Sequence, residues 1–461
     1  MTEMIRCVSP VDGRVYAERQ ADSGAEIEAA LAMARAARRD WRRTPIAERA
    51  RLCLAAVDAM LAMRDEIVPE LAWQMGRPVR YGAGELRGFE ERACHMVAIA
   101  EEALRFIESG PKDKFSRFVA REPLGLVLVI APWNYPYLTA VNSVVPALMA
   151  GNAVILKHAA QTLLVGERFQ RAFDRAGAPQ GLMQTLTLTH AATAAIISAR
   201  QVDQVNITGS VLGGQEIEKA AAGTFTGIGL ELGGKDPAYV RADADLPQAI
   251  ENLVDGSFFN SGQSCCGIER IYVQKDRYHD FVDGFVELTK TYVLGDPLAE
   301  ATTLGPMPRA SGADLVRRQI AASAGAKALI DPRLFPKDAS GTPYLAPQVV
   351  VDVDHQMSLM REESFGPVVG IMPVADDDEA VRLMNDSPYG LTASIWTRDA
   401  DAATRLGAEI ETGTVFMNRC DYLDPALAWT GVKDTGRGAT LSRVGYETLT
   451  RPKSYHLRLA F

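Results

Sequence analysis

The uncharged stretch Pro123–Leu156, PLGLVLVIAPWNYPYLTAVNSVVPALMAGNAVIL, decides the fold of this chain. It is long enough to cross a bilayer as a helix. However, Pro132, Asn134 and Pro136 interrupt it, and unpaired backbone groups would be costly in lipid. We therefore interpret the stretch as a buried strand, a loop, a buried helix and a second buried strand, and we expect no membrane partner.

Short apolar runs alternate with helical patterns beyond this stretch. The apolar runs are 124–130, 152–157, 182–188, 203–207 and 227–232, with helical patterns at 163–178 and 191–200. Strands that are apolar throughout, separated by helices, are typical of a parallel sheet covered on both faces. The sequence thus predicts an α/β fold with a doubly wound parallel sheet, whose ligands bind beyond the carboxyl ends of the strands.

Helices precede this sheet and a mixed region follows it. Residues 24–107 carry apolar side chains at intervals of three and four, which indicates packing helices. A helix near 246–258 and further strand–helix segments extend to about 434. Residues 446–461 alternate like an exposed strand with no obvious partner in its own core, and such an edge invites pairing with another subunit.

The composition is that of an ordinary globular protein of two or three domains. The chain has 461 residues, 47% of them hydrophobic and 23% charged, and a net charge of −9. No cluster of Lys and Arg offsets this charge, so we do not expect a nucleic-acid partner. The first residues, MTEMIRCVSP, lack an apolar signal core, so we expect a cytoplasmic protein.

Two of the six cysteines, Cys265 and Cys266, are neighbours within NSGQSCCGIER. No pair has CxxC spacing and no histidine lies nearby, so we expect no metal site. A disulfide between neighbours requires an unusual peptide geometry. The pair is therefore either buried and inert or contains a nucleophile.

Several polar residues follow directly on predicted strands. Asn134 stands on a loop held by prolines and could donate to an oxyanion, or could cap its own turn. Lys157 could hold a ribose or phosphate, or could extend to solvent at the sheet edge. Gly209, Ser210 and Gly214 open a helix whose free N–H groups suit a phosphate, although the turn could also be purely structural.

Glu231 lies in the otherwise apolar strand GIGLELGG. Burial disfavours a charged carboxylate and raises its pKa, which makes it a usable general base near neutral pH. The alternative is a structural glutamate in a salt bridge.

These candidates occur in the order, and at roughly the spacings, of the aldehyde dehydrogenase superfamily, which the chain resembles over nearly its whole length. The resemblance is carried by APWNYP (131–136), GNAVILK (151–157), TGSVLGG (208–214), LELGGKDP (230–237), FFNSGQSC (258–265), EESFGPV (362–368), NDSPYGL (385–391) and TGVKDTGRG (430–438).

The resemblance implies a role for each candidate. Cys265 matches the nucleophile, which attacks an aldehyde carbonyl, while Cys266 lines the pocket beside it. The amide of Asn134 and the backbone N–H of Cys265 hold the oxyanion. Hydride leaves for a nicotinamide cofactor, and water activated by Glu231 hydrolyses the thioester. A carboxylate at this position favours hydrolysis to a free acid over transfer to coenzyme A.

The resemblance also implies a Rossmann-like cofactor domain. The matching cofactor contacts are Ile130, Pro132, Trp133, Lys157, Gly209, Ser210, Gly214, Leu232, Glu363 and Phe365. Relatives that prefer NAD often carry a Glu three residues after the lysine, where it repels a 2′-phosphate. Here that residue is Ala160, so we predict that the protein uses both NAD and NADP.

Positions matching the acyl pocket of the family are Tyr135, Thr139, Asn142, Phe259, Ser264, Cys266, Arg419, Leu423 and Trp429. Aromatic residues predominate, which favours a medium-sized apolar or aromatic aldehyde. The alternative is that Arg419 binds the carboxylate of a semialdehyde acid. A third possibility for Arg419 is that it points to solvent at the rim.

Two further departures from the family concern other parts of the chain. Thr189 and His190 replace small residues near the expected adenine site, where His190 could stack on adenine or, as we favour, lie on the surface. Many relatives pair a Lys with a C-terminal Glu as a proton relay. The equivalents here are Ser143 and Arg451, which predicts that Glu231 serves hydrolysis alone.

The resemblance implies three structural units and a homodimer or homotetramer. The expected units are a cofactor domain of residues 1–107 and 124–233, a catalytic domain of 234–434, and a bridging element of 108–123 and 435–461. Two other functional classes remain as alternatives: a thiol esterase that uses the same Cys and Glu, and a non-catalytic binding protein.

Overall fold

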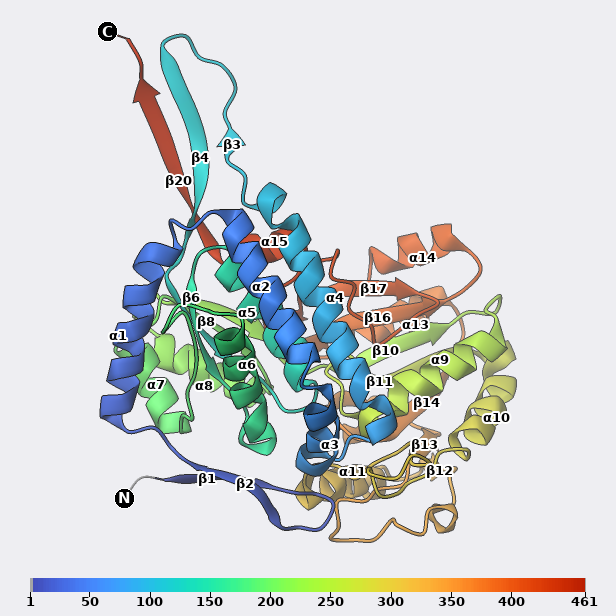
Figure 1. Cartoon of the computed structure of the whole chain (residues 1–461). Helices are drawn as coiled ribbons and strands as arrows, with labels where there is room; N and C mark the ends of the chain where they lie inside the picture. Colours follow the sequence, from blue (N-terminus) through green and yellow to red (C-terminus); the bar gives the residue numbers. More distant parts are fainter. Residues whose placement is uncertain (1–2, 461) are drawn as a thin grey trace.

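The computed structural model describes residues 3–460 and contains the predicted parallel sheet (Figure 1). Its strand order is β19-β9-β8-β5-β6-β7, and all neighbours are parallel except β19, which runs antiparallel to β9. The strands are β5 (Leu126–Ile130), β6 (Ala153–Lys157), β7 (Met183–Thr185), β8 (Gln204–Thr208), β9 (Gly227–Glu231) and β19 (Gly436–Arg437). The predicted doubly wound α/β fold is confirmed.

The uncharged stretch forms β5, a loop, helix α5 (Pro136–Met149) and β6, as predicted. Both strands are buried along their whole length, because helices cover the sheet on both sides. Pro136 occupies the first turn of α5, where its missing N–H costs nothing. None of the helices within residues 3–460 is both long and apolar enough to cross a membrane.

Helices surround this sheet in the order expected from the sequence. They are α1 (Gly24–Trp41), α2 (Ile46–Leu61), α3 (Arg64–Met75), α4 (Val79–Ala103), α6 (Leu163–Arg175), α7 (His190–Ser198) and α8 (Val211–Ala221). Ser23 and Glu26 form a reciprocal capping box that starts α1. The long helix α4 packs against α5, which places one of its faces beside the loop that follows β5.

The second half of the chain forms a seven-stranded sheet in the order β12-β13-β14-β11-β10-β16-β17. Its strands are β10 (Asp236–Val240), β11 (Ile268–Gln274), β12 (Lys327–Ala328), β13 (Gln348–Val351), β14 (Val368–Val374), β16 (Thr392–Trp396) and β17 (Thr414–Met417). Its helices are α9 (Leu246–Phe258), α10 (Tyr278–Thr289), α11 (Ala310–Ala322), α12 (Ser358–Arg361), α13 (Asp377–Asn385) and α14 (Ala400–Gly407). Separate apolar clusters lie on this sheet.

The C-terminal strand β20 (Thr450–Arg458) pairs with β4 (Phe115–Pro123) along its length, and β3 (Ile107–Glu108) completes the small sheet. This pairing agrees with the bridging element of residues 108–123 and the tail that the family resemblance implies. The alternation of the tail alone does not indicate this partner, because β4 lies more than 300 positions earlier in the sequence. The outer edge of β20 is nevertheless unpaired in this protomer, and the sheet projects from the body (Figure 1).

Short elements complete the described chain. The N-terminus forms an antiparallel hairpin of β1 (Met4–Val8) and β2 (Val15–Gln20), and β15 (Tyr389–Gly390) pairs with β18 (Val432–Lys433). Helix α15 (Ser442–Glu447) packs against α4 and α5. Because β19 joins the first sheet and α15 packs on its helices, only β20 of the expected tail segment belongs to the projecting sheet.

Candidate active site

The predicted nucleophile Cys265 follows a short 3-10 turn at the end of α9. Asn260, Ser261 and Gly262 are consecutive residues with positive φ, at 53°, 57° and 69°. The left-handed conformation is strained for the first two residues, which carry a Cβ. A Cβ on Gly262 would lie 2.2 Å from the backbone oxygen of Gly366. Only the surrounding hydrogen bonds can hold the loop in this form.

Asn260 and Asn134 together hold the cysteine loop against the loop that follows β5. Asn134 Nδ2 donates to the backbone oxygen of Gln263 at 3.1 Å. Asn260 Nδ2 donates to the backbone oxygens of Asn134 and Gln263, each at 3.2 Å. The amide predicted to stabilise an oxyanion is therefore buried and fixed close to the loop of Cys265.

Arg77, a residue that the sequence analysis missed, joins three parts of this site. Its Nε donates to Asn260 Oδ1 at 3.2 Å, its Nη2 donates to the backbone oxygen of Asn134, and its Nη1 pairs with Glu85. Glu85 Oε1 in turn accepts from the backbone nitrogens of Tyr137 and Leu138 at 2.9 and 3.1 Å, at the start of α5. The sequence around Arg77 does not indicate these contacts, because Asn134 and Asn260 lie 57 and 183 positions away and only Glu85 is near in the chain.

Glu231 lies at the end of β9, where its carboxylate accepts hydrogen bonds from two hydroxyls. Thr208 Oγ1 donates at 2.9 Å, and Thr440 Oγ1 donates to the other oxygen. Burial raises the pKa of Glu231, although these two hydroxyls and the charge of Arg92 partly counteract the shift. The alternative of a salt-bridged structural glutamate does not apply, because Glu231 has no ion pair within residues 3–460.

A cavity of about 410 Å³ brings Cys265, Glu231 and most of the predicted substrate pocket together, while Asn134 is not among the residues that line it. The predicted residues that line it are Tyr135, Thr139, Asn142, Glu231, Phe259, Ser264, Cys265, Cys266, Leu423 and Trp429. Arg419 does not line it. Its side chain is exposed and its guanidinium stacks 3.4 Å from the ring centre of Tyr422, which does line the cavity. Arg419 therefore lies outside the cavity, behind Tyr422, and does not make the carboxylate contact that the sequence analysis offered for it.

Two charged residues of the cavity wall, buried Arg92 and half-buried Asp421, escaped the sequence analysis. Arg92 comes from α4. Asp421 comes from the loop after β17 and accepts hydrogen bonds from Ser264 Oγ at 2.7 Å and Cys266 Sγ at 3.0 Å. Burial raises the pKa of Asp421. Hydrogen bonding with Cys265, burial and the charge of Asp421 raise the pKa of Cys266 well above its usual value. Cys266 is therefore held as a neutral thiol.

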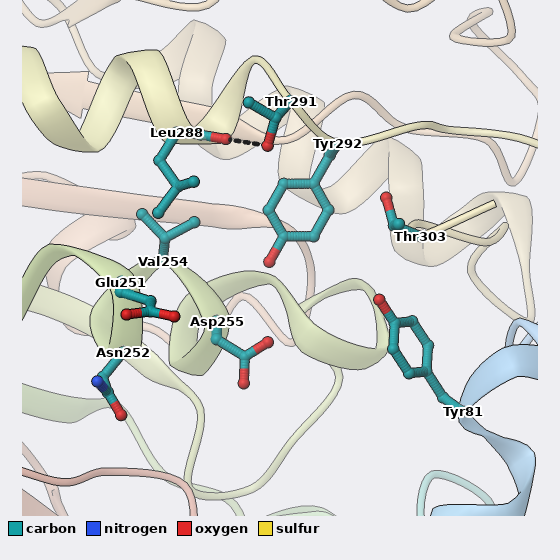
Figure 2. A pocket seen from close by; sticks show the side chains of 9 residues that line it. All are labelled: Tyr81, Glu251, Asn252, Val254, Asp255, Leu288, Thr291, Tyr292 and Thr303. Atoms are coloured by element: carbon teal, nitrogen blue, oxygen red, sulfur yellow. Dashed lines mark hydrogen bonds between the residues drawn. The ribbon is translucent and has the colours of Figure 1, made fainter. Parts of the chain in front are cut away.

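A second cavity of about 400 Å³ adjoins the first (Figure 2). Tyr81 and Asp255 line both, and Tyr81 packs edge-on against Phe259 with ring centres 5.1 Å apart. Burial raises the pKa of Asp255 to about 6. Glu251 lies beside Asp255 on α9, and Tyr292 points toward Asp255 from the opposite side of this second cavity (Figure 2). The wall between the two cavities is thus formed by one tyrosine and one carboxyl group.

The predicted phosphate site at the start of α8 has the expected geometry. Ser210 caps the helix, with its Oγ accepting from the backbone nitrogen of Gly213 at 3.2 Å. A Cβ on Gly214 would lie 2.6 Å from Leu232, so glycine is needed for the helix to approach β9. The first N–H groups of α8 remain available to an anion, which fits a dinucleotide.

Lys157 ends β6 and is buried, and its Nζ has one long contact, 3.4 Å to the backbone oxygen of His158. Burial lowers its pKa. A buried ammonium with so few partners fits hydroxyls of a bound ribose. Ala160 opens the next 3-10 turn and places no carboxylate there. His190 is exposed at the start of α7, as favoured from the sequence.

Glu363 and Phe365 lie opposite the loop that follows β5. Trp133 and Phe365 pack edge-on, with ring centres 5.5 Å apart. Glu363 accepts from the backbone nitrogen of Gly234 at 3.1 Å, and burial raises the pKa of Glu363 to about 8. Ile130 ends β5, and Pro132 and Trp133 follow it, so the ring contact joins the loop after β5 to the segment of Glu363 and Phe365.

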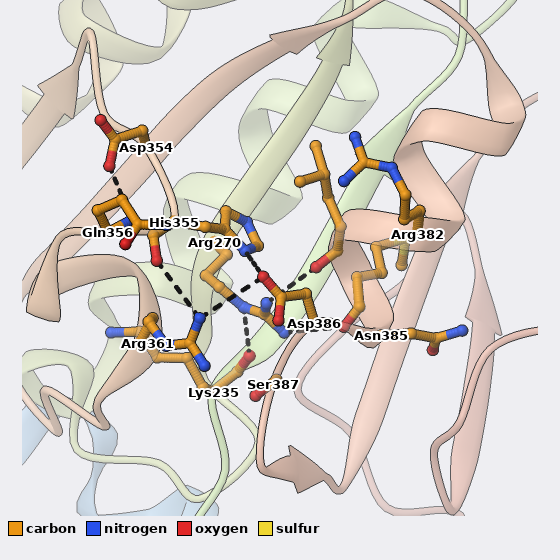
Figure 3. A network of polar contacts seen from close by, with 12 residues as sticks. Lys235, Arg270, Asp354, His355, Gln356, Arg361, Arg382, Asn385, Asp386 and Ser387 are labelled. Carbon is orange, nitrogen blue, oxygen red and sulfur yellow. Dashed lines mark hydrogen bonds and ion pairs between the residues drawn. The ribbon is translucent and has the colours of Figure 1, made fainter.

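A buried polar network fastens the segment that carries Glu363 and Phe365. Lys235 pairs with Glu269, whose carboxylate accepts from the backbone nitrogens of Ser364 and Phe365 at 2.8 and 2.9 Å. Arg270 donates to the backbone oxygen of Lys235 at 2.8 Å (Figure 3).

The network continues to the surface through a histidine. Arg270 also reaches the backbone oxygens of Leu383 and Met384 at the end of α13. His355 lies between Tyr272 and Asp386 and forms a hydrogen bond of 2.8 Å with each. Asp386 also forms an ion pair with Arg361 (Figure 3). These contacts join β11 to the end of α13 and to the loop that precedes α12.

A further cavity of about 240 Å³ lies beneath Glu231 and is also lined by Ser143, Thr440 and Thr448. Arg451, expected at the relay position, is not among its residues. It lies on β20, where its side chain is 3.6 Å from Glu122. The chain after α15 turns outward at Thr450 to pair with β4, so Thr448 is the tail residue that faces this cavity.

All six cysteines are free thiols. Within residues 3–460, no group of three or more His, Cys, Asp and Glu side chains is arranged to hold a metal ion.

Comparison with known proteins agrees with this geometry. Residues 1–455 match the model of the Aldehyde dehydrogenase family. The chain is 34% identical over 453 residues to succinate-semialdehyde dehydrogenase [NADP(+)] of Mycobacterium avium, covering 98% of this chain and 96% of the relative.

Solved structures show the same fold. An NAD-dependent aldehyde dehydrogenase from Sinorhizobium meliloti superposes with a TM-score of 0.94 at 31% identity, covering 100% of this chain and 92% of that one. An NADP-dependent glyceraldehyde-3-phosphate dehydrogenase from Bacillus halodurans in complex with NADP superposes with a TM-score of 0.93 at 31% identity, covering 99% and 96%.

The chain belongs to the aldehyde dehydrogenase family. The predicted class of enzyme, an NAD(P)-dependent aldehyde dehydrogenase, is confirmed, which sets aside the esterase and binding-protein alternatives as its main role.

Proposed function

We propose that this enzyme oxidises a semialdehyde acid to a dicarboxylic acid with NADP or NAD. The observation that carries the hydrolytic chemistry is that Cys265 and Glu231 line one cavity, with Glu231 half-buried and without an ion pair within residues 3–460. A nucleophile and a base of raised pKa that face the same space suit a reaction with a covalent intermediate and its hydrolysis.

In the proposed mechanism the thiolate of Cys265 attacks the aldehyde carbon. The side-chain amide of Asn134 and the backbone N–H of Cys265 stabilise the oxyanion that forms, and one such donor is worth about 3–4 kcal/mol. After oxidation the acyl group remains on Cys265 as a thioester. Glu231 takes a proton from a water molecule, which attacks the thioester and releases the acid. Cys266 stays a neutral thiol and forms part of the wall.

The cofactor supplies the hydride acceptor for the oxidation. Ser210 and the first turn of α8 would hold its pyrophosphate, Lys157 its adenosine ribose, and Glu363 and Phe365 its nicotinamide ribose and ring. The absence of a carboxylate at Ala160 supports acceptance of a 2′-phosphate, and the Mycobacterium avium relative is named for NADP. We therefore propose that NADP serves as well as NAD.

The substrate proposal rests on the relatives named succinate-semialdehyde dehydrogenase and on the guanidinium of Arg92, which is buried in the cavity wall. Tyr135, Phe259 and Trp429 also line this cavity, and they favour the second candidate, a medium-sized apolar or aromatic aldehyde. The two candidates differ in one feature, a negative charge at the far end of the substrate.

We further propose that the projecting sheet makes a homodimer or homotetramer. The edge of β20 is unpaired in the protomer, and Leu457 and Leu459 on the tail are 45% and 68% exposed. An open edge with exposed apolar side chains is well suited to pair with a second copy. The first sheet and its helices would then serve as the cofactor domain, and the second sheet as the catalytic domain.

The decisive experiment measures NAD(P)H formation with succinic semialdehyde, pentanal and benzaldehyde, each with NAD and with NADP. We expect the highest kcat/KM for succinic semialdehyde. A higher kcat/KM for either uncharged aldehyde would replace the first candidate with the second. No oxidation of any aldehyde, with intact binding of NADPH, would contradict both.

A further inference from the structure

Arg92 is buried in the wall of the active-site cavity without a carboxylate partner. Its exposed fraction is 7%, and it forms no ion pair within residues 3–460. Its Nη1 donates to the backbone oxygen of Leu138 at 2.8 Å and to Asn142 Oδ1 at 3.3 Å, both on α5. Its Nε and Nη2 have no protein partner, yet they are not sealed inside the protein, so they open onto the cavity.

The nearby carboxyl groups are already engaged. Glu85, whose charge acts most strongly on Arg92, pairs with Arg77 and accepts from the start of α5. Asp421 accepts from Ser264 and Cys266. Glu231 accepts from two threonine hydroxyls. None of these groups contacts Arg92.

The cavity is less negative than three carboxyl groups would make it, because Asp421, Glu231 and Asp255 are ionised less readily than usual. Burial raises the pKa of each of them, that of Asp255 to about 6. Arginine, in contrast, stays charged in proteins even when burial lowers its pKa. A buried charge without a partner is costly, and evolution tolerates it where a ligand supplies the missing partner.

The position of Arg92 is suited to the far end of a short substrate. Glu85, Gly88 and Arg92 lie on the face of α4 that packs against α5 and borders the cavity. Arg92 lines the same cavity as Cys265, Cys266 and Glu231, so its guanidinium borders the space that holds the reacting centre. Its planar fork of N–H donors matches the two oxygens of a carboxylate.

We propose that Arg92 is the residue that recognises the distal carboxylate of the substrate and so selects semialdehyde acids over uncharged aldehydes. This inference rests on the proposed function, and it takes over the role that the sequence analysis had offered to Arg419. Arg92 binds the carboxylate through Nε and Nη2, while its bonds to Leu138 and Asn142 fix the guanidinium plane.

The test compares two substrates with one carbon skeleton, succinic semialdehyde and its methyl ester, in wild type, Arg92→Leu and Arg92→Lys. The readout is the ratio of the two kcat/KM values, because a general folding defect lowers both and leaves their ratio unchanged. We expect Arg92→Leu to lower the ratio roughly 100-fold, mainly through KM for the charged substrate, and Arg92→Lys to restore part of it.

Arg87→Leu is the matched control, since Arg87 borders the same cavity but is exposed. We expect its ratio to stay within about threefold of wild type. Inhibition by succinate gives a second readout that needs no turnover, and its Ki should rise in Arg92→Leu and not in Arg87→Leu.

The outcomes separate the inference from the proposed function. If wild type does not prefer the charged substrate, the substrate proposal fails and the role of Arg92 fails with it. If wild type prefers it and Arg92→Leu keeps that preference, the substrate stands and the role of Arg92 is overturned. Loss of preference in Arg87→Leu alone would assign the role to Arg87 instead.

Discussion

The Nε atom of Arg77 lies 3.2 Å from Oδ1 of Asn260, across a sequence separation of 183 residues. This contact ties the turn before α4 to the strained loop of Cys265. The same guanidinium reaches the backbone of Asn134 and pairs with Glu85, so one side chain positions the nucleophile and the oxyanion donor together.

Replacing Arg77 with Met should therefore damage both stability and catalysis. Breaking a buried ion pair leaves Glu85 uncompensated and costs about 3–5 kcal/mol. We expect urea denaturation to show that loss, and kcat to fall at least about tenfold because the cysteine loop relaxes. Arg80→Met, at an exposed arginine on α4, is the control and should change neither. An unchanged kcat in Arg77→Met would show that the loop holds its own shape.

The two adjacent cysteines should respond differently to substitution with serine. Cys265→Ser should lose at least about a thousandfold in kcat, because a serine hydroxyl is a poor replacement for a thiolate. Cys266→Ser should stay within about tenfold of wild type, since a serine hydroxyl can also donate to Asp421. Peptide mapping after brief iodoacetamide treatment should find the label on Cys265. Preferential labelling of Cys266 would reverse the assignment.

Glu231→Gln should separate the two halves of the reaction. Without its base the thioester accumulates, so stopped-flow traces should show a burst of NADPH of about one per active site and then a slow phase. In wild type, the steady-state rate should rise as the pH passes through the raised pKa of Glu231 and should then become constant, because the base must be ionised. A variant without a burst and with full turnover would exclude Glu231 as the base.

Glu231→Gln should slow hydrolysis but stabilise the folded protein at neutral pH. The raised pKa means that folded protein binds the proton of Glu231 more tightly than unfolded protein. Wild type therefore loses stability as pH rises from the ordinary value of 4.5 through the raised pKa. We expect the Tm of Glu231→Gln to exceed that of wild type above this window and to match it below, as measured by scanning calorimetry. An equal difference at all pH values would contradict the shift.

Ala160→Glu should convert the cofactor preference. A carboxylate at the start of this turn would repel a 2′-phosphate and could accept from ribose hydroxyls beside Lys157. We expect kcat/KM for NADP to fall at least about tenfold while that for NAD is kept or raised. Ala160→Gln has nearly the same shape without the charge and should shift the preference much less. Strong preference for NAD in wild type would contradict the proposed dual use.

The double substitution Leu457→Glu and Leu459→Glu should disrupt assembly without unfolding the protomer. Both side chains are exposed on the projecting tail, so charges there should repel a second copy while leaving the pairing of β20 with β4 intact. Light scattering should show a smaller particle than in wild type. Glu substitution of exposed Leu212, which lies on α8 away from this sheet, is the control. If the wild-type protein is a monomer, the proposed assembly through the projecting sheet is wrong.

The sequence alone determined most of the elements and, through its resemblance to one family, predicted the catalytic chemistry. The uncharged stretch around Asn134 could only be buried strand, loop and helix, since charge, length and proline positions are local properties. Glu231 and Cys265 could be assigned because each lies in a short motif whose order along the chain resembles one family. Alternation predicted the projecting strand β20 as a strand, but only the family resemblance, and not the local pattern, grouped it with the segment that contains β4.

The tertiary structure decided what shares the cavity with those residues. Arg77, Glu85, Arg92 and Asp421 carry no local signal, because their partners come from helices and loops distant in the chain. Arg419 matched the acyl pocket by position, yet its neighbour Asp421 turns inward and Arg419 stacks outside on Tyr422. Short motifs identify the predicted reacting groups, because that chemistry needs particular residue types at particular spacings. A substrate pocket, in contrast, needs charges of the right sign in one place, and any element that packs against it can provide them.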